Sequence, residues 1–130
     1  MGSSAHQQTL LPRATIDAFY MDQATRKALQ DTVADWRMAR IAMNVHDGGL
    51  DAATSHYRNS QSPELVAVEL PTAANDVEGA IDRLASHCQP GTGAIVLGHT
   101  NDVRLYRRLT EMGVSDYLVG PYGIEELIGS

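Results

Sequence analysis

The 130-residue sequence has little of several residue types, and each shortage restricts its function. Its one cysteine, Cys88, excludes an internal disulfide and is typical of a reducing compartment. Lys27 is its one lysine, and the formal net charge of −6 argues against a nucleic-acid-binding surface, which normally carries a basic excess. No apolar run is long enough to cross a bilayer. With 43% hydrophobic residues, the composition predicts one compact cytoplasmic domain.

Short apolar runs alternate with amphipathic stretches along residues 14–130, after a polar segment, 1–13, that we expect to be flexible. Strands are expected over 15–21, 39–45, 64–70, 94–98 and 114–120. A helical stretch follows each of them, the last over 123–128. Five strand–helix units predict a doubly wound α/β domain. We expect a flavodoxin-like or CheY-like parallel sheet in the order 2-1-3-4-5 with helices on both faces.

The helical stretches contain residues that predict which face of each helix is buried and where the helix begins or ends. The inner face of the first helix is expected to consist of Leu29, Val33 and Trp36. We expect Asn75 to begin the third helix, with Glu78 in a capping box, and Thr100 or Asn101 to begin the fourth. Gly113 is expected to end the fourth helix. Cys88, on an inner stripe, is interpreted as a buried apolar residue and not as a nucleophile.

Four of the predicted strands deliver residues to one edge of the sheet. Those residues are Asp22, Glu69, Gly98 with His99, and Gly120. A functional pocket is expected there, because ligands of such sheets bind outside the carboxyl ends of the strands. A metal site at Asp22, Glu69 and His99 is one alternative. The five histidines show no His-x-x-x-His spacing, however, so we expect neither a metal nor a cofactor.

Three features resemble the receiver domains of bacterial response regulators, over residues 14–128. They are an acid after the first strand, an acid followed by Leu-Pro after the third, and the run "GVSDYLVGP" before the last helix. In such receivers, two acids hold Mg²⁺, an Asp accepts a phosphoryl group, and a Ser or Thr and a Lys complete the pocket. Matched by position, this chain has Met21-Asp22, Glu69, Gly98 and Gly120 instead.

These replacements predict a receiver without phosphoryl chemistry. Losing a carboxylate weakens Mg²⁺ binding, and losing Lys removes the cation that offsets phosphoryl charge. A misplacement of about 1 Å costs on the order of 10²-fold in a positioned reaction, so a longer Glu69 is a poor substitute for Asp. We expect Glu69 to be a solvated acid at a strand end. The alternatives are a permanent mimic of the phosphorylated charge and a genuine phospho-accepting regulator.

A second resemblance is narrower. The stretch 95–121, with "GHTNDVRLYR" and "GVSDYL", and the stretch "ARIAMNVHDGGLDAA" are similar to the pilus-assembly proteins called TadZ or CpaE. This resemblance implies a non-catalytic module that self-associates and helps to place the type IV (Flp/Tad) pilus machinery at a cell pole. In that family a ParA/MinD-like ATPase domain follows, and no Gly-x-x-x-x-Gly-Lys-Ser/Thr loop occurs in this sequence.

Aromatic and basic residues of the fourth helix and fifth strand predict an interface. We expect a homodimer through a face made of Arg104, Tyr106, Arg107, Arg108, Tyr117 and Tyr122. The alternative is an ordinary solvated helix face. A flavodoxin-like cofactor carrier is disfavoured, because the loop "MDQATRK" lacks the Ser, Thr and Gly that would wrap a phosphate. The resemblance to TadZ or CpaE implies pilus or secretion proteins as partners, and we expect neither nucleic acid nor membrane to bind.

Overall fold

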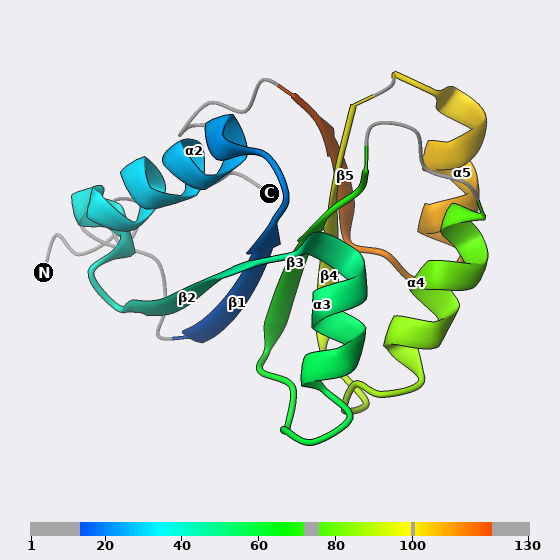
Figure 1. Ribbon diagram of the computed structural model, residues 1–130, viewed down its shortest axis with the longest axis horizontal. Coiled ribbons are helices and arrows are strands. Elements are labelled where there is room, and N and C mark those ends of the chain that lie inside the picture. The colour runs from blue at the N-terminus through cyan, green and yellow to red at the C-terminus, as the bar shows by residue number, and fades with distance from the viewer. Residues whose placement is uncertain (1–13, 72–75, 100, 121–130) are drawn as a thin grey trace, which may run out of the picture.

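A parallel sheet of five strands forms the centre of the protein in the computed structural model, which describes residues 14–71, 76–99 and 101–120 (Figure 1). The strands are β1 (Ala14–Tyr20), β2 (Ile41–Asp47), β3 (Leu65–Glu69), β4 (Gly93–Gly98) and β5 (Asp116–Val119). The helices are α2 (Gln23–Ala34), η1 (Trp36–Met38), α3 (Gly49–His56), α4 (Val77–Ala85) and α5 (Val103–Glu111). The order β2-β1-β3-β4-β5 confirms the predicted fold and topology.

The two faces of the sheet are covered by different helices. Phe19 and Val68 pack with α3, α4 and α5, whereas Ala18, Ala67 and Leu97 pack with α2 on the other face (Figure 1). This alternation follows from the two-residue period of a strand. It makes β3, at the centre of the sheet, apolar on both sides, as the run "LVAV" predicted. Among the described residues, no helix is both long and apolar enough to span a bilayer.

Helix α2 buries a different stripe from the one predicted. Thr25, Leu29 and Thr32 face the sheet, while Val33 is 41% exposed. The prediction is confirmed for Leu29 and wrong for Val33, because it counted threonine as polar. The Thr32 hydroxyl donates to the Ala28 carbonyl and the Thr25 hydroxyl to Glu69, so both methyl groups can pack without leaving a polar atom unpaired. The side chain of Trp36 lies outside the described residues.

Two helices begin one or two residues later than predicted. The N-cap of α4 is Asp76, whose carboxylate accepts from the Gly79 N–H, and the N-cap of α5 is Asp102, which accepts from the N–H groups of Arg104 and Leu105. The predictions of Asn75 and of Thr100 or Asn101 were therefore wrong. An aspartate is favoured here because its charge also interacts with the positive end of the helix dipole.

The remaining helix predictions are partly confirmed. Gly113, with φ of 96°, follows the end of α5 as expected, and Leu50, Ala53 and Tyr57 form the buried face of α3 and its C-terminal end. Such a positive φ favours glycine, because a Cβ would crowd the backbone. The predicted helix over 123–128 and the segment 1–13 lie outside the described residues.

Candidate functional site

Glu69 ends β3 and is fully buried, so the expectation of a solvated acid was wrong. Its Oε1 accepts hydrogen bonds from the backbone N–H of Met21, at 2.6 Å, and of Asp22, at 3.0 Å. Its Oε2 accepts from the Thr25 hydroxyl at 2.8 Å. The carboxylate thus binds the loop between β1 and α2 and the first turn of α2.

A histidine approaches the same carboxylate from the neighbouring strand. The Nε2 atom of His99, just after β4, lies 3.1 Å from Glu69 Oε2. Burying a carboxylate costs free energy unless it is hydrogen-bonded, and the contacts of Glu69 supply that compensation. Because the carboxylate lies next to the N-terminus of α2, it also interacts favourably with the positive end of the helix dipole. Glu69 therefore connects segments that follow β1 and β4 on either side of β3.

The other predicted pocket positions, Asp22, Gly98 and Gly120, lie at this edge, and each makes hydrogen bonds within the protein. The Asp22 carboxylate caps α2 by accepting from the Ala24 N–H at 2.7 Å. Of the three residues considered as a metal site, Glu69 and His99 are in contact, whereas the Asp22 carboxylate caps α2. The Gly120 N–H donates to the Gly98 carbonyl at 3.1 Å, so these two positions contribute backbone contacts between β4 and β5.

Tyr117 fills the space that a side chain on residue 98 would need. A Cβ built on Gly98 would collide with the Tyr117 hydroxyl and ring. Tyr117 is only 8% exposed, whereas we had expected it on an exposed interface. The position where the resemblance places a hydroxyl is therefore closed by an aromatic ring from β5.

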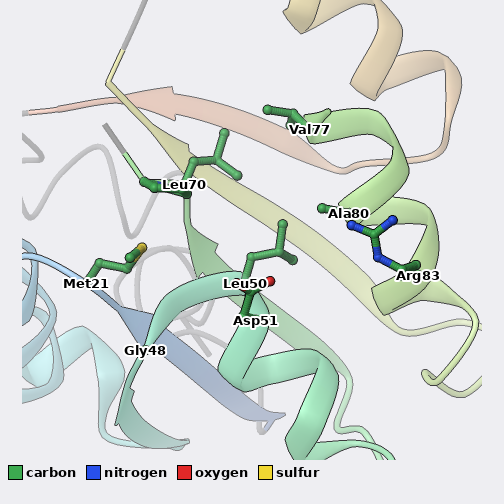
Figure 2. A pocket seen from close by; sticks show the side chains of 9 residues that line it. Met21, Gly48, Leu50, Asp51, Leu70, Val77, Ala80 and Arg83 are labelled. Atoms are coloured by element: carbon green, nitrogen blue, oxygen red, sulfur yellow. The ribbon is translucent and has the colours of Figure 1, made fainter. Parts of the chain in front are cut away.

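A cavity of about 230 Å³ lies between the residues that follow β1 and β3 and the helices α3 and α4. Figure 2 shows Met21 and Leu70 on one side and Val77, Ala80 and Arg83 of α4 on the other. Its remaining lining residues are Gly48, Leu50, Asp51 and Pro71. A thioether thus lines the cavity where the resemblance places an acid.

Two glycines lie at the start of α3, and the first of them, Gly48, lines this cavity. Gly48 and Gly49 have φ of 109° and 60°, which favour glycine. A Cβ on Gly49 would lie 2.6 Å from the Glu69 carbonyl oxygen and 2.8 Å from Met21 Sδ. The double glycine therefore lets the β2–α3 turn approach β3 and Met21 closely.

A second buried carboxylate, Asp17 of β1, lies beneath α3 and was missed by the sequence analysis. Its Oδ1 accepts from the Asn44 amide at 3.0 Å and its Oδ2 from the Tyr57 hydroxyl at 2.5 Å. Burial, and secondarily the hydrogen bond to Asp17, raise the pKa of Tyr57, so its hydroxyl stays protonated. His46 and His56 have ring nitrogens near the same carboxylate. Polar residues alternate with apolar ones in β1 and β2, and this pattern could have indicated a polar group on one face of the sheet.

The predicted interface residues fall into two groups. Arg104, Tyr106 and Arg107 are exposed on α5. Arg108 Nη1 lies 2.6 Å from Glu78 Oε2 and links α5 to α4. That guanidinium lowers the pKa of Glu78. Tyr122 lies outside the described residues, so α5 alone carries the predicted face among them.

Cys88 packs partly buried against the cluster under α3 to α5. Burial raises the pKa of its thiol, which lowers the thiolate fraction at neutral pH. This agrees with a packing role for Cys88.

The strand order β2-β1-β3-β4-β5, with an acid at the end of β3, is that of the CheY-like receiver fold. A CheY-like response regulator from Mesorhizobium loti is 17% identical, with a TM-score of 0.63, over 90% of this chain and 94% of that chain. The beryllofluoride-activated DrrB receiver domain is 14% identical, with a TM-score of 0.67, over 90% and 92%. At such identities the likeness shows the fold alone.

Two other solved structures are similar in sequence as well. The pilus assembly protein CpaE from Caulobacter crescentus is 43% identical, with a TM-score of 0.88, over 94% of this chain and 93% of that chain. A putative CpaE2 pilus assembly protein from Sinorhizobium meliloti is 38% identical, with a TM-score of 0.81, over 88% and 94%. No protein-family model and no curated protein matches the sequence. The chain belongs to the CpaE family of pilus assembly proteins.

Proposed function

We propose that this chain is a non-catalytic, degenerate receiver domain that acts by protein–protein contact in type IV (Flp/Tad) pilus assembly. Family membership supports the pilus role. The observation that carries the non-catalytic part is the full burial of Glu69 with its two carboxylate oxygens engaged. The domain works in the cytoplasm, is recruited to a cell pole, and contacts pilus or secretion proteins and the ParA/MinD-like ATPase of the full-length family.

Phosphoryl transfer needs groups that this pocket does not provide. A carboxylate nucleophile must approach the phosphorus atom, but the Glu69 oxygens are held by the N–H groups of Met21 and Asp22 and by the Thr25 hydroxyl. Mg²⁺ needs oxygen ligands in octahedral geometry, and the Asp22 carboxylate caps α2. Gly120 offers no cation to the developing charge.

The same contacts give Glu69 a structural role that resembles a switch held in one state. Its charge binds the β1–α2 loop and approaches His99 without any modification. Partner proteins would then recognise one unchanging conformation at the carboxyl edge of the sheet. The rival function is a phospho-accepting regulator whose Glu69 accepts the phosphoryl group.

A phosphodonor assay separates the two functions. The protein is incubated with acetyl phosphate and Mg²⁺, and its intact mass is measured beside an ordinary receiver domain treated in the same way. We expect the mass of this protein to stay unchanged while the ordinary receiver gains a phosphoryl group. A phosphoryl adduct that maps to Glu69 would support the rival.

Self-association is proposed to use the exposed face of α5. Arg104, Tyr106 and Arg107 are exposed there, and arginine and tyrosine are enriched at interfaces. The double variant Arg104→Glu/Arg107→Glu should lower the oligomeric mass measured by light scattering. The matched control is Arg40→Glu/Arg58→Glu, which makes the same charge change at exposed positions away from α5. An equal mass for the two double variants would remove α5 as the interface.

A further inference from the structure

Asp17 of β1, His46 of β2 and His56 of α3 come together between the sheet and α3. In the parallel pairing of β1 with β2, Asp17 lies opposite Asn44 and Phe19 lies opposite His46. Residues two apart on a strand share a face, so all four point to the face that α3 covers. Helix α3 then brings His56 over the same place. One donor atom from each of Asp17, His46 and His56 lies within 4.8 Å of the others.

The carboxylate of Asp17 is oriented as a ligand would be. It is 7% exposed, and the Asn44 amide and the Tyr57 hydroxyl each donate to a different oxygen. Each carboxylate oxygen can accept more than one contact, so both retain capacity for a further partner. Neutral donors that hold a ligating carboxylate in place are typical of the outer shell of a metal site.

Aromatic packing fixes the two imidazole rings. His46 stacks on Phe19 with centroids 4.7 Å apart, and His56 packs edge-on against Tyr57 at 5.0 Å. The two imidazole centroids lie 5.2 Å from each other. The rings are thus held beside one another and beside a buried carboxylate.

We propose that Asp17, His46 and His56 bind one divalent transition-metal ion of the Zn²⁺ type, with solvent in the remaining position. Two imidazoles and one carboxylate favour such ions over Mg²⁺ or Ca²⁺, which prefer oxygen ligands alone. Bonds of about 2.0–2.2 Å in a tetrahedral site place ligand atoms about 3.4 Å apart. Ion binding would draw the donor atoms, which now lie within 4.8 Å of one another, to that spacing through side-chain rotation of the histidines along their aromatic contacts. The ion would join β1, β2 and α3, and the site is separate from Glu69.

The test uses untagged protein freed of metal with a chelator and titrated with ZnCl₂ by calorimetry. We expect one ion per chain, a higher melting temperature with Zn²⁺, and no binding of MgCl₂. His46→Gln and His56→Gln should each weaken Zn²⁺ binding at least tenfold. The matched control His87→Gln, just after α4, should leave Zn²⁺ binding unchanged. Tyr57→Phe removes an outer-shell donor and should weaken it about tenfold.

A second experiment uses the wild-type protein and therefore does not depend on whether a substitution disturbs the fold. Imidazole signals of the wild-type protein are followed by NMR during the Zn²⁺ titration. Shifts at His46 and His56 without shifts at His87 and His99 support the site. Absence of binding to the wild-type protein, binding unaffected by His46→Gln and His56→Gln, or shifts confined to other histidines would overturn it, and Asp17 would then be only a hydrogen-bonded core residue.

Discussion

Glu69 and Asp17 are both buried carboxylates at the sheet, but the protein surrounds them differently. Glu69 faces two backbone N–H groups, which can only donate, together with a hydroxyl and His99. Asp17 faces an amide and a phenol, which can both donate and accept, with two imidazoles nearby. Residue 69 therefore favours a group that accepts through both atoms, whereas the side chains around residue 17 can pair with either a donor or an acceptor.

The two carboxylates therefore differ in how far the protein's own groups already occupy their oxygens. At the edge where receiver-like domains place their chemistry, the protein's own groups occupy the carboxylate. Beneath α3, the carboxylate is positioned, but the groups that face it are neutral hydrogen-bond partners and metal-type ligands. The oxygens of Glu69 are thus engaged mainly by backbone groups of one loop, whereas those of Asp17 accept from neutral side chains of β2 and the end of α3.

The largest expected effect is that of Glu69→Gln. The amide keeps the volume but replaces one acceptor oxygen with an NH₂ donor. That NH₂ either faces the Met21 and Asp22 N–H groups, which cannot accept, or takes the place of the charged oxygen beside the Thr25 hydroxyl and His99. We expect a loss of about 3 kcal/mol in the free energy of unfolding, measured by urea denaturation. Glu111→Gln, an exposed residue at the end of α5, is the control. A loss no greater than the control's would contradict the role of Glu69.

Gly98→Ala should have the next largest effect, because its Cβ needs the space of the Tyr117 ring. We expect a loss of about 2 kcal/mol, together with displacement of the ring that shows in the NMR signals of labelled Tyr117. Gly91→Ala, where a Cβ meets no atom within 4 Å but φ is 90°, is a control that adds backbone strain without a collision. Unmoved Tyr117 signals in Gly98→Ala would contradict the closed edge.

Asp17→Asn should cost less than Glu69→Gln, about 1 kcal/mol in the absence of metal. The new amide can donate to the Tyr57 oxygen or to the Asn44 carbonyl, so no buried donor is left facing another donor. The comparison is made by urea denaturation of both variants in the same buffer with a chelator. Equal losses for the two variants would remove the contrast between the two carboxylates.

Glu78→Gln should have the smallest effect, because its partner Arg108 lies at the surface. Arg108 lowers the pKa of Glu78, so the ion pair stabilises the protein above the unfolded-state pKa and is lost as pH falls through the lowered folded-state pKa. The melting temperature of the wild type should exceed that of the variant slightly at neutral pH and equal it in strong acid. A difference that grows on acidification would contradict this sign.

Much of the fold could be predicted because it depends on local patterns. Alternating runs such as "LVAV" located β3, and glycines such as Gly113 located a helix end. The caps were displaced because Asp76 and Asp102 lie beside other residues that also cap helices, and only the backbone geometry selects between them. The threonine stripe of α2 was missed because a hydroxyl becomes compatible with burial once its acceptor is known.

The candidate site was predicted in position but not in character. The strand ends brought Glu69 and Gly98 to one edge as expected. The burial of Glu69 depends on donors 44 to 48 residues away in sequence, Thr25, Asp22 and Met21, which no local pattern connects to it. Likewise, the group around Asp17 joins side chains of β1, β2 and α3 that are brought together by strand register and helix packing. Such long-range pairings require the three-dimensional structure.

The most direct test of the central account is fluorine NMR of the protein with beryllofluoride and Mg²⁺, a stable analogue of the phosphorylated carboxylate. Because the protein's own N–H and hydroxyl groups occupy the Glu69 oxygens, we predict only the signals of free beryllofluoride at saturating concentrations. A protein-bound fluoride signal that requires Mg²⁺ and disappears in Glu69→Gln would show that residue 69 is open to phosphoryl chemistry, and would contradict the account.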